Sequence, residues 1–186
     1  MDRMGKSTRL LKKRLDMDDR EFRTKREIQE DFPNLTSDEF IITSRINFRY
    51  NCFAWAAGYD TLNMQPSNNP MYGWLTGEIG ETLDNFEKQY KYLDFERTDN
   101  DEYEEGIEKV AFYAKNDIIQ HASRQMENGW WTSKLGQMGE DIAHKTLNGL
   151  EGEEYGQIEM ILKRPAKERK QVSESERVFE NAFENF

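Results

Sequence analysis

The stretch of sequence that decides the fold is residues 109–134, KVAFYAKNDIIQHASRQMENGWWTSK. Two runs rich in β-branched and aromatic residues, 109–115 and 118–127, flank turn residues at 116–117, so we expect two antiparallel strands. Asn and Gly at 128–129 are typical of a tight β-hairpin, and a third strand is expected after them, up to residue 134. The stretch therefore predicts a three-stranded antiparallel meander.

Working outward from the meander, residue patterns predict further elements on both sides. A helix is indicated by apolar residues at three- and four-residue spacing, and a strand by a short apolar run. The expected elements are a strand at 40–43, a short helix at 51–58, a helix at 79–93, a solvated acidic loop at 94–108, a helical turn at 140–144 and a strand at 155–163.

Composition limits the classes of protein to consider. The 186 residues carry a net charge of −10 with 33% charged and 12% aromatic residues, which fits one folded domain with solvated tails. No apolar run approaches the ~20 residues of a membrane helix, so we expect no membrane span. The acidic balance argues against a nucleic-acid partner. A single cysteine excludes an internal disulfide framework and indicates the cytoplasm.

Charge and polarity divide the chain into three parts. Residues 1–30 are expected to form a basic N-terminal helix or arm, because residues 1–27 hold ten bases against six acids. Residues 31–165 are expected to form the folded domain. Residues 166–186 are expected to form a polar linker and a C-terminal helix. This helix begins with a capping box at Ser173 and has a Phe-rich apolar face. We expect the arm or this last helix to contact an unknown protein partner.

Cys52 has the clearest chemical context. Asn51 is expected to cap a short helix that ends at Gly58, which would place the Cys52 thiol at the positive end of the helix. A helix N-terminus lowers the pKa of a thiol and favours the nucleophilic thiolate. The competing interpretation is a buried, inert cysteine, since free cysteine is among the most buried residue types.

Two histidines could complete a site around this thiol. His121, on the second predicted strand, is the expected base, and a third polar group would orient its ring. Ser133 on the next strand and Asp141 after the glycine-rich turn are the candidates for that group. His144 is interpreted as a structural histidine or as a further member of the catalytic set. No phosphate loop or metal motif is present, so we expect no cofactor, and a zinc site of Cys52, His121 and His144 remains an alternative.

Several motifs, taken together, resemble a family of known sequence but unknown activity. They are Tyr50-Asn51-Cys52-Phe53-Ala54-Trp55-Ala56, Glu108-Lys109-Val110-Ala111-Phe112-Tyr113, His121-Ala122-Ser123-Arg124-Gln125, Gly129-Trp130-Trp131-Thr132-Ser133-Lys134-Leu135-Gly136, Asp141-Ile142-Ala143-His144 and Leu150-Glu151-Gly152-Glu153-Glu154-Tyr155-Gly156. In this order they are similar to a bacterial family of uncharacterised domains, over roughly residues 32–165. This resemblance implies a domain but no activity.

The arrangement is similar, more distantly, to papain-like thiol hydrolases. This resemblance implies an α+β fold in which the Cys-bearing helix packs on an antiparallel sheet, here with helical N- and C-terminal extensions. Cys52 would be the nucleophile and His121 the base. In an alternative register Lys109 takes the place of the base and His121 that of the orienting group, which would leave the site incomplete.

Two hypotheses about function follow. The first is a cysteine-dependent hydrolase or acyltransferase that acts on an amide or thioester bond, with the backbone N–H of Cys52 helping to hold the oxyanion. The second is a non-catalytic protein-interaction module on the same fold, because a fold does not by itself imply an activity.

Overall fold

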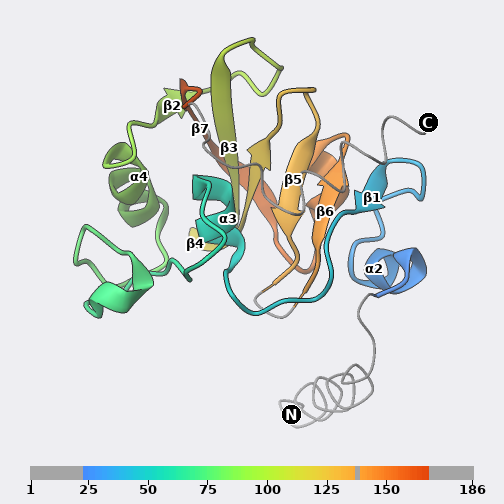
Figure 1. The fold of residues 1–186 in the computed structure, drawn as a ribbon, viewed down its shortest axis with the longest axis horizontal. Coiled ribbons are helices and arrows are strands. Elements are labelled where there is room, and N and C mark those ends of the chain that lie inside the picture. The colour runs from blue at the N-terminus through green and yellow to red at the C-terminus, as the bar shows by residue number, and fades with distance from the viewer. Residues whose placement is uncertain (1–22, 137–138, 168–186) are drawn as a thin grey trace, which may run out of the picture.

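The computed structural model describes residues 23–136 and 139–167, and within them one antiparallel sheet dominates (Figure 1). Its seven strands follow the spatial order β1-β6-β5-β4-β3-β7-β2. The strands are β1 (Phe40–Ile42), β2 (Glu96–Thr98), β3 (Ile107–Lys115), β4 (Ile118–Gln125), β5 (Trp131–Lys134), β6 (Asp141–His144) and β7 (Gln157–Pro165). The helices are α2 (Lys25–Asp31), α3 (Cys52–Ala57) and α4 (Leu83–Lys91), with short 3₁₀ helices η1 (Pro70–Tyr72) and η2 (Leu147–Leu150). None of the helices in the described part of the chain is long and apolar enough to cross a membrane.

The expectation of a papain-like α+β fold is wrong. The structure is mostly a seven-stranded antiparallel sheet with a few short helices, and the helix that bears Cys52 has six residues. Gly58 ends this helix after less than two turns by adopting a left-handed conformation, φ 94°, that favours glycine. The N-terminal extension contributes α2 from residue 25 onward, whereas residues 1–22 and the predicted C-terminal helix lie outside the described residues.

The meander predicted from residues 109–134 is confirmed as β3, β4 and β5. The turn between β3 and β4 uses Asn116 and Asp117, whose φ angles of 49° and 63° suit the tight hairpin turn that matches the twist of the strands. Gly129 takes a φ of 85° in the next turn. The residues of these two turns therefore determine how β3, β4 and β5 pair.

Other elements differ from the expectation. The predicted helical turn at 140–144 is wrong, because Asp141–His144 is strand β6, which pairs with both β5 and β1. The Leu135 N–H donates to the carbonyl oxygen of Glu140 at 2.8 Å, just before β6 begins. The predicted helix at 79–93 is shorter, α4, because the Thr82 side chain accepts a hydrogen bond from the Asn85 N–H and caps it there. Strand β2 lies in the segment expected to be an acidic loop.

The sheet has a hydrophobic core on each face. The first face carries α3 and α4, whose residues Trp55 and Phe86 pack with Phe112 of β3. The second face carries α2 and η2, where Ile28 and Leu150 contribute to the core around β6. Successive residues of a strand point to opposite faces, so each strand supplies both cores in alternation.

Candidate functional site

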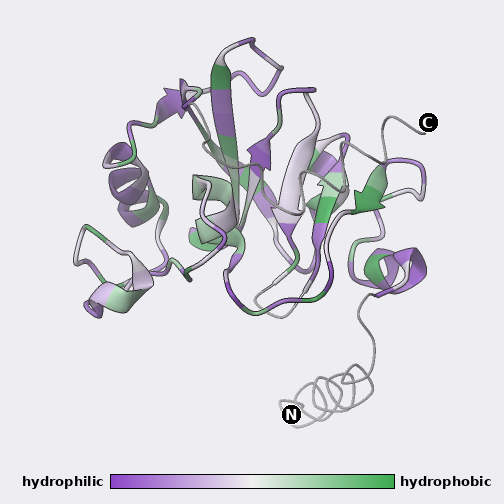
Figure 2. Ribbon diagram, in the orientation of Figure 1, coloured by the Kyte–Doolittle hydropathy of each residue, from purple (hydrophilic) through white to green (hydrophobic). Residues whose placement is uncertain are grey.

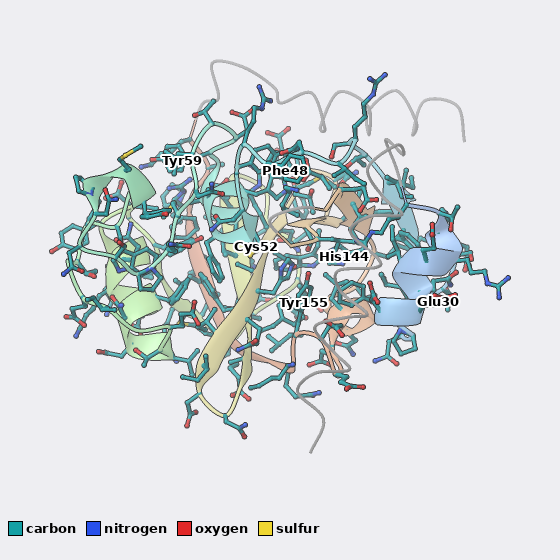
Figure 3. The ribbon with its side chains drawn as sticks, turned by 90° about the horizontal axis from the view of Figure 1, so that it is seen from below. Glu30, Phe48, Cys52, Tyr59, His144 and Tyr155 are labelled. Carbon is teal, nitrogen blue, oxygen red and sulfur yellow. The ribbon has the colours of Figure 1, made fainter. Side chains whose placement is uncertain are left out.

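Cys52 begins α3 as the sequence predicts. The Oδ1 atom of Asn51 accepts a hydrogen bond from the Ala54 N–H at 3.0 Å, which confirms Asn51 as the N-cap. The helix lies against β4 and β5, and the Trp55 indole N–H donates to Thr132 Oγ1 at 3.1 Å. Cys52 is therefore fixed at the N-terminus of a helix that packs on the middle of the sheet (Figure 3).

The chemical consequence of this position differs from the expectation. Only 7% of Cys52 is exposed. Burial raises the pKa of the Cys52 thiol from 9.0 to about 12, and backbone hydrogen bonds near Ala122 and Phe53 oppose this only in part. The desolvation of a thiolate outweighs the stabilisation that a six-residue helix provides. Cys52 is thus a protonated thiol at neutral pH.

The structure does not bring Cys52 and His121 together. On β3 and β4, Phe112 pairs with Ala122 in the same core as Cys52, whereas Tyr113 pairs with His121. Because neighbouring residues of a strand point to opposite faces, His121 lies on the second face and Cys52 on the first. The backbone of the sheet separates the predicted nucleophile from its predicted base.

His121 is held by stacking. Its ring lies parallel to that of Tyr155, with 4.0 Å between centroids and an interplanar angle of 2°. His121 is fully buried, and neither ring nitrogen has a hydrogen-bond partner among the described residues. Burial, and secondly the nearby His144, lower the pKa of His121 well below its usual value. The ring is therefore neutral at physiological pH.

The structure does bring Ser133 and His144 together. His144 Nδ1 lies 2.8 Å from the carbonyl oxygen of Thr146, which can only accept, so this nitrogen carries the proton. Nε2 must then accept from the Ser133 hydroxyl at 2.9 Å, and Ser133 Oγ accepts from Ser123 Oγ at 2.6 Å. The result is a chain of hydrogen bonds across β4, β5 and β6.

This Ser–His pair is closed to substrates. Ser123, Ser133 and His144 are all 0% exposed. Burial lowers the pKa of His144 to about 4, so the imidazole is neutral and accepts a hydrogen bond. The arrangement satisfies buried polar groups within the sheet. In Figure 3, His144 and Tyr155 lie on the α2 side of Cys52.

Asp141 lies with Lys134, its cross-strand partner on β5. The Tyr50 hydroxyl donates to Asp141 Oδ2, and the Lys134 ammonium group donates to the carbonyl oxygens of Asn47 and Gly139. Burial lowers the pKa of Lys134 to about 8, while Asp141 and Glu140 act in the opposite direction. Asp141 thus anchors the segment before α3. Its side chain lies on the face of the sheet opposite His121, so it does not orient the His121 ring.

The other sequence-based alternatives take different places. Lys109, the base of the alternative register, is buried and donates its Nζ to the carbonyl oxygen of Glu102, with Glu104 Oε2 at 3.6 Å. For the zinc hypothesis, Cys52 lies on the face opposite His121. Within residues 23–136 and 139–167, no three His, Cys, Asp or Glu side chains gather in a manner that could hold a metal ion.

A surface that the sequence did not indicate lies beside α4. A hollow of about 360 Å³ is lined by Thr76, Glu78, Lys88, Lys91 and Tyr92. Four large apolar side chains are exposed on the segment that precedes α4 and directly after this helix: Met71 by 83%, Leu75 by 58%, Ile79 by 73% and Tyr92 by 64%. We call the hollow and these four residues the corner surface. Met71 and Leu75 fall between the elements that the sequence predicts, and the exposure of an apolar side chain in such a segment cannot be read from its composition.

The corner surface is rigidly built. The buried amide of Asn85 donates to the carbonyl oxygens of Glu78 and Gly80 and accepts from Thr76 Oγ1 at 2.8 Å. The buried Gln89 amide accepts from the Leu75 N–H at 2.7 Å and donates to the carbonyl oxygen of Gly73. These two amides of α4 hold the preceding segment in place while its apolar side chains face outward.

Comparison with known proteins supplies a family. Residues 41–163, more than half of the chain, match the family described as "Domain of unknown function (DUF7689)". The chain belongs to the DUF7689 family. This confirms the resemblance to an uncharacterised family, and the DUF7689 region contains Cys52, His121, Ser133, Asp141 and His144 as well as the corner surface. No curated protein and no solved structure matches the chain.

Proposed function

We propose that this chain is a non-catalytic protein-binding domain and that the corner surface is where it binds. The observation that carries the proposal is the exposure of Met71, Leu75, Ile79 and Tyr92 on a segment fixed by buried hydrogen bonds. Exposed apolar residues that gather around a hollow are typical of an interaction site. In Figure 2 parts of this segment are coloured as hydrophobic although they lie at the periphery beside α4.

The chemistry of the hollow favours an apolar side chain from the partner. The charges of its lysines are already paired, Lys88 with Asp84 at 2.8 Å and Lys91 with Glu87 at 2.8 Å. A long lysine side chain keeps its charge at the surface, so the methylene stems of Lys88 and Lys91 can line the hollow together with Tyr92. The partner we propose is a protein segment with two or more apolar side chains on one side.

The buried groups support binding over catalysis. A thiol with a pKa of about 12 is not a nucleophile at neutral pH, and its predicted base lies on the other face of the sheet. The cysteine-hydrolase hypothesis stays a prediction, which the experiment below also tests. We also propose the cytoplasm as the compartment, because a chain with one cysteine has no internal disulfide framework.

The test compares partner binding by variants of the full chain. Interacting proteins are identified in cells by cross-linking and mass spectrometry, and the affinity of each is then measured with purified components. Leu75→Asp or Ile79→Asp is expected to weaken binding at least about tenfold, since burying one such side chain contributes about 1.5–3 kcal/mol. Cys52→Ala is expected to leave the affinity unchanged.

Phe48→Asp is the matched control. Phe48 is exposed by 58%, the same as Leu75, and lies away from α4 in Figure 3. If Leu75→Asp and Phe48→Asp weaken the affinity for a partner equally, that partner does not bind at the corner surface. Stoichiometric labelling of Cys52 in the folded protein at pH 7 by a thiol-reactive acyl probe would overturn the non-catalytic assignment.

A further inference from the structure

The described chain ends beside the corner surface. After β7, the Ala166 N–H donates to the carbonyl oxygen of Gly106 at 2.8 Å, and Lys167 Nζ lies 2.8 Å from Asp94 Oδ2. Asp94 follows Tyr92 of the corner surface by two residues. Arg164 of β7 also donates to the carbonyl oxygen of Leu93 at 2.8 Å. Three contacts thus fix the start of segment 168–186, two of them next to the C-terminal end of α4.

The sequence of that segment fits an apolar surface. Ser173 and Glu176 form the capping box of a predicted helix that runs to residue 186. The apolar residues of this helix share one face because their spacing follows the helical repeat, and they are Val178, Phe179, Ala182, Phe183 and Phe186. A helix with such a face needs an apolar surface to cover it.

Chain length limits where this helix can dock. Residues 168–172 span at most about 17–20 Å when fully extended. The predicted helix must therefore begin within that distance of Lys167, whose ion-pair partner Asp94 is two residues from Tyr92 in the lining of the hollow. The helix itself would be about 21 Å long, which is longer than the nine-residue helix α4 beside the hollow.

We propose that residues 173–186 form a helix that docks its apolar face on the corner surface of its own chain and that a partner must displace it. The displacement rests on the proposed function; the docking itself does not. The segment acts as an internal competitor, so the affinity for a partner falls by the fraction of molecules in which the surface is covered.

The experiment is photo-cross-linking in the full chain. A benzophenone amino acid replaces Ile79, and the cross-linked peptides are identified by mass spectrometry. We expect cross-links to residues 178–186, whereas the same group at Phe48 should give none to that segment. Phe179→Asp with Phe183→Asp should reduce the yield at least tenfold, and the polar-face control Glu180→Lys with Glu184→Lys should retain it.

Three results would overturn the docking. The first is the absence of a cross-link from position 79, and the second is an equal yield from position 48. The third is a cross-link that joins an isotopically labelled copy to an unlabelled one, because it would show that the segment docks on another molecule. Partner affinity measured on the same variants separates the two proposals. If cross-links are missing but Leu75→Asp still abolishes partner binding, only the docking fails; if cross-links form but no partner depends on Leu75, only the proposed function fails.

Discussion

Lowering the pH from 7.5 to 4.5 is expected to destabilise the fold through its buried histidines. The pKa of His144 is about 4 in the folded protein and 6.5 for an unperturbed histidine. A base whose pKa is depressed by folding binds its proton more readily in the unfolded chain. The free energy of unfolding is therefore fully retained above pH 6.5 and decreases as the pH falls toward 4.

The size of the effect follows from the two pKa values. The difference between 6.5 and about 4, at about 1.36 kcal/mol per pKa unit, amounts to about 3 kcal/mol, most of which is lost by pH 4.5. His121 adds to the loss, because burial lowers its pKa as well. A loss of this size is a large part of the 5–15 kcal/mol that is typical of folded domains.

The assay is urea unfolding followed by tryptophan fluorescence at pH 7.5, 6.5, 5.5 and 4.5. His144→Gln removes the titration while its side-chain oxygen can still accept from Ser133. We expect the variant to be less stable at pH 7.5 but to lose about 2–3 kcal/mol less than the wild type by pH 4.5. Equal slopes for the two proteins, or a flat wild-type profile between pH 7 and 5, would refute the reasoning.

Three further outcomes follow from buried groups. At pH 8, iodoacetamide should modify Cys52 at least about a hundredfold more slowly in the folded protein than in urea, because its pKa is raised to about 12; similar rates would contradict the burial of the thiol. His121→Phe should keep the stack on Tyr155 without an unpartnered polar ring, so its unfolding free energy at pH 7.5 should equal or exceed that of the wild type. His121→Ala should instead cost about 2–4 kcal/mol by leaving a cavity, and the idea fails if Phe is the worse substitution. Arg164→Ala should cost about 3–5 kcal/mol in urea unfolding, because Arg164 Nη2 lies 2.7 Å from Glu108 Oε2 in a buried pair; a cost near zero would show that the carboxylate finds another partner.

Local signals in the sequence predicted part of the fold. Asn51, Gly58 and the Asn-Gly turn at 128–129 act through their own backbone conformations, so their effects could be read without the rest of the chain. Strand β6 could not be read in this way. Its four residues carry no strand pattern of their own, and pairing with β5 and β1 on both sides makes them a strand. Such long-range pairing overrides local propensity.

The candidate site was harder to predict, because sequence spacing does not give the face of the sheet. Cys52 and His121 were expected to meet because one begins a helix and the other lies on a strand. Whether they meet depends on the register of β4, in which His121 pairs with Tyr113 and its neighbour Ala122 faces the helix. A shift of one residue would reverse this assignment. Ser133 and His144 do form a pair, but predicting it required that residues 141–144 be recognised as strand β6.

The two outermost strands of the sheet have a consequence for self-association. β1 and β2 contain three residues each, and β2 includes the charged residues Glu96 and Arg97. A long, flat and apolar edge would offer its free backbone groups to a strand from another molecule and so promote aggregation. Both edge strands are short and β2 is also charged, so either edge gives an incoming strand few hydrogen bonds in register. The sheet formed by the described residues is thus protected at its edges against growth by strand addition.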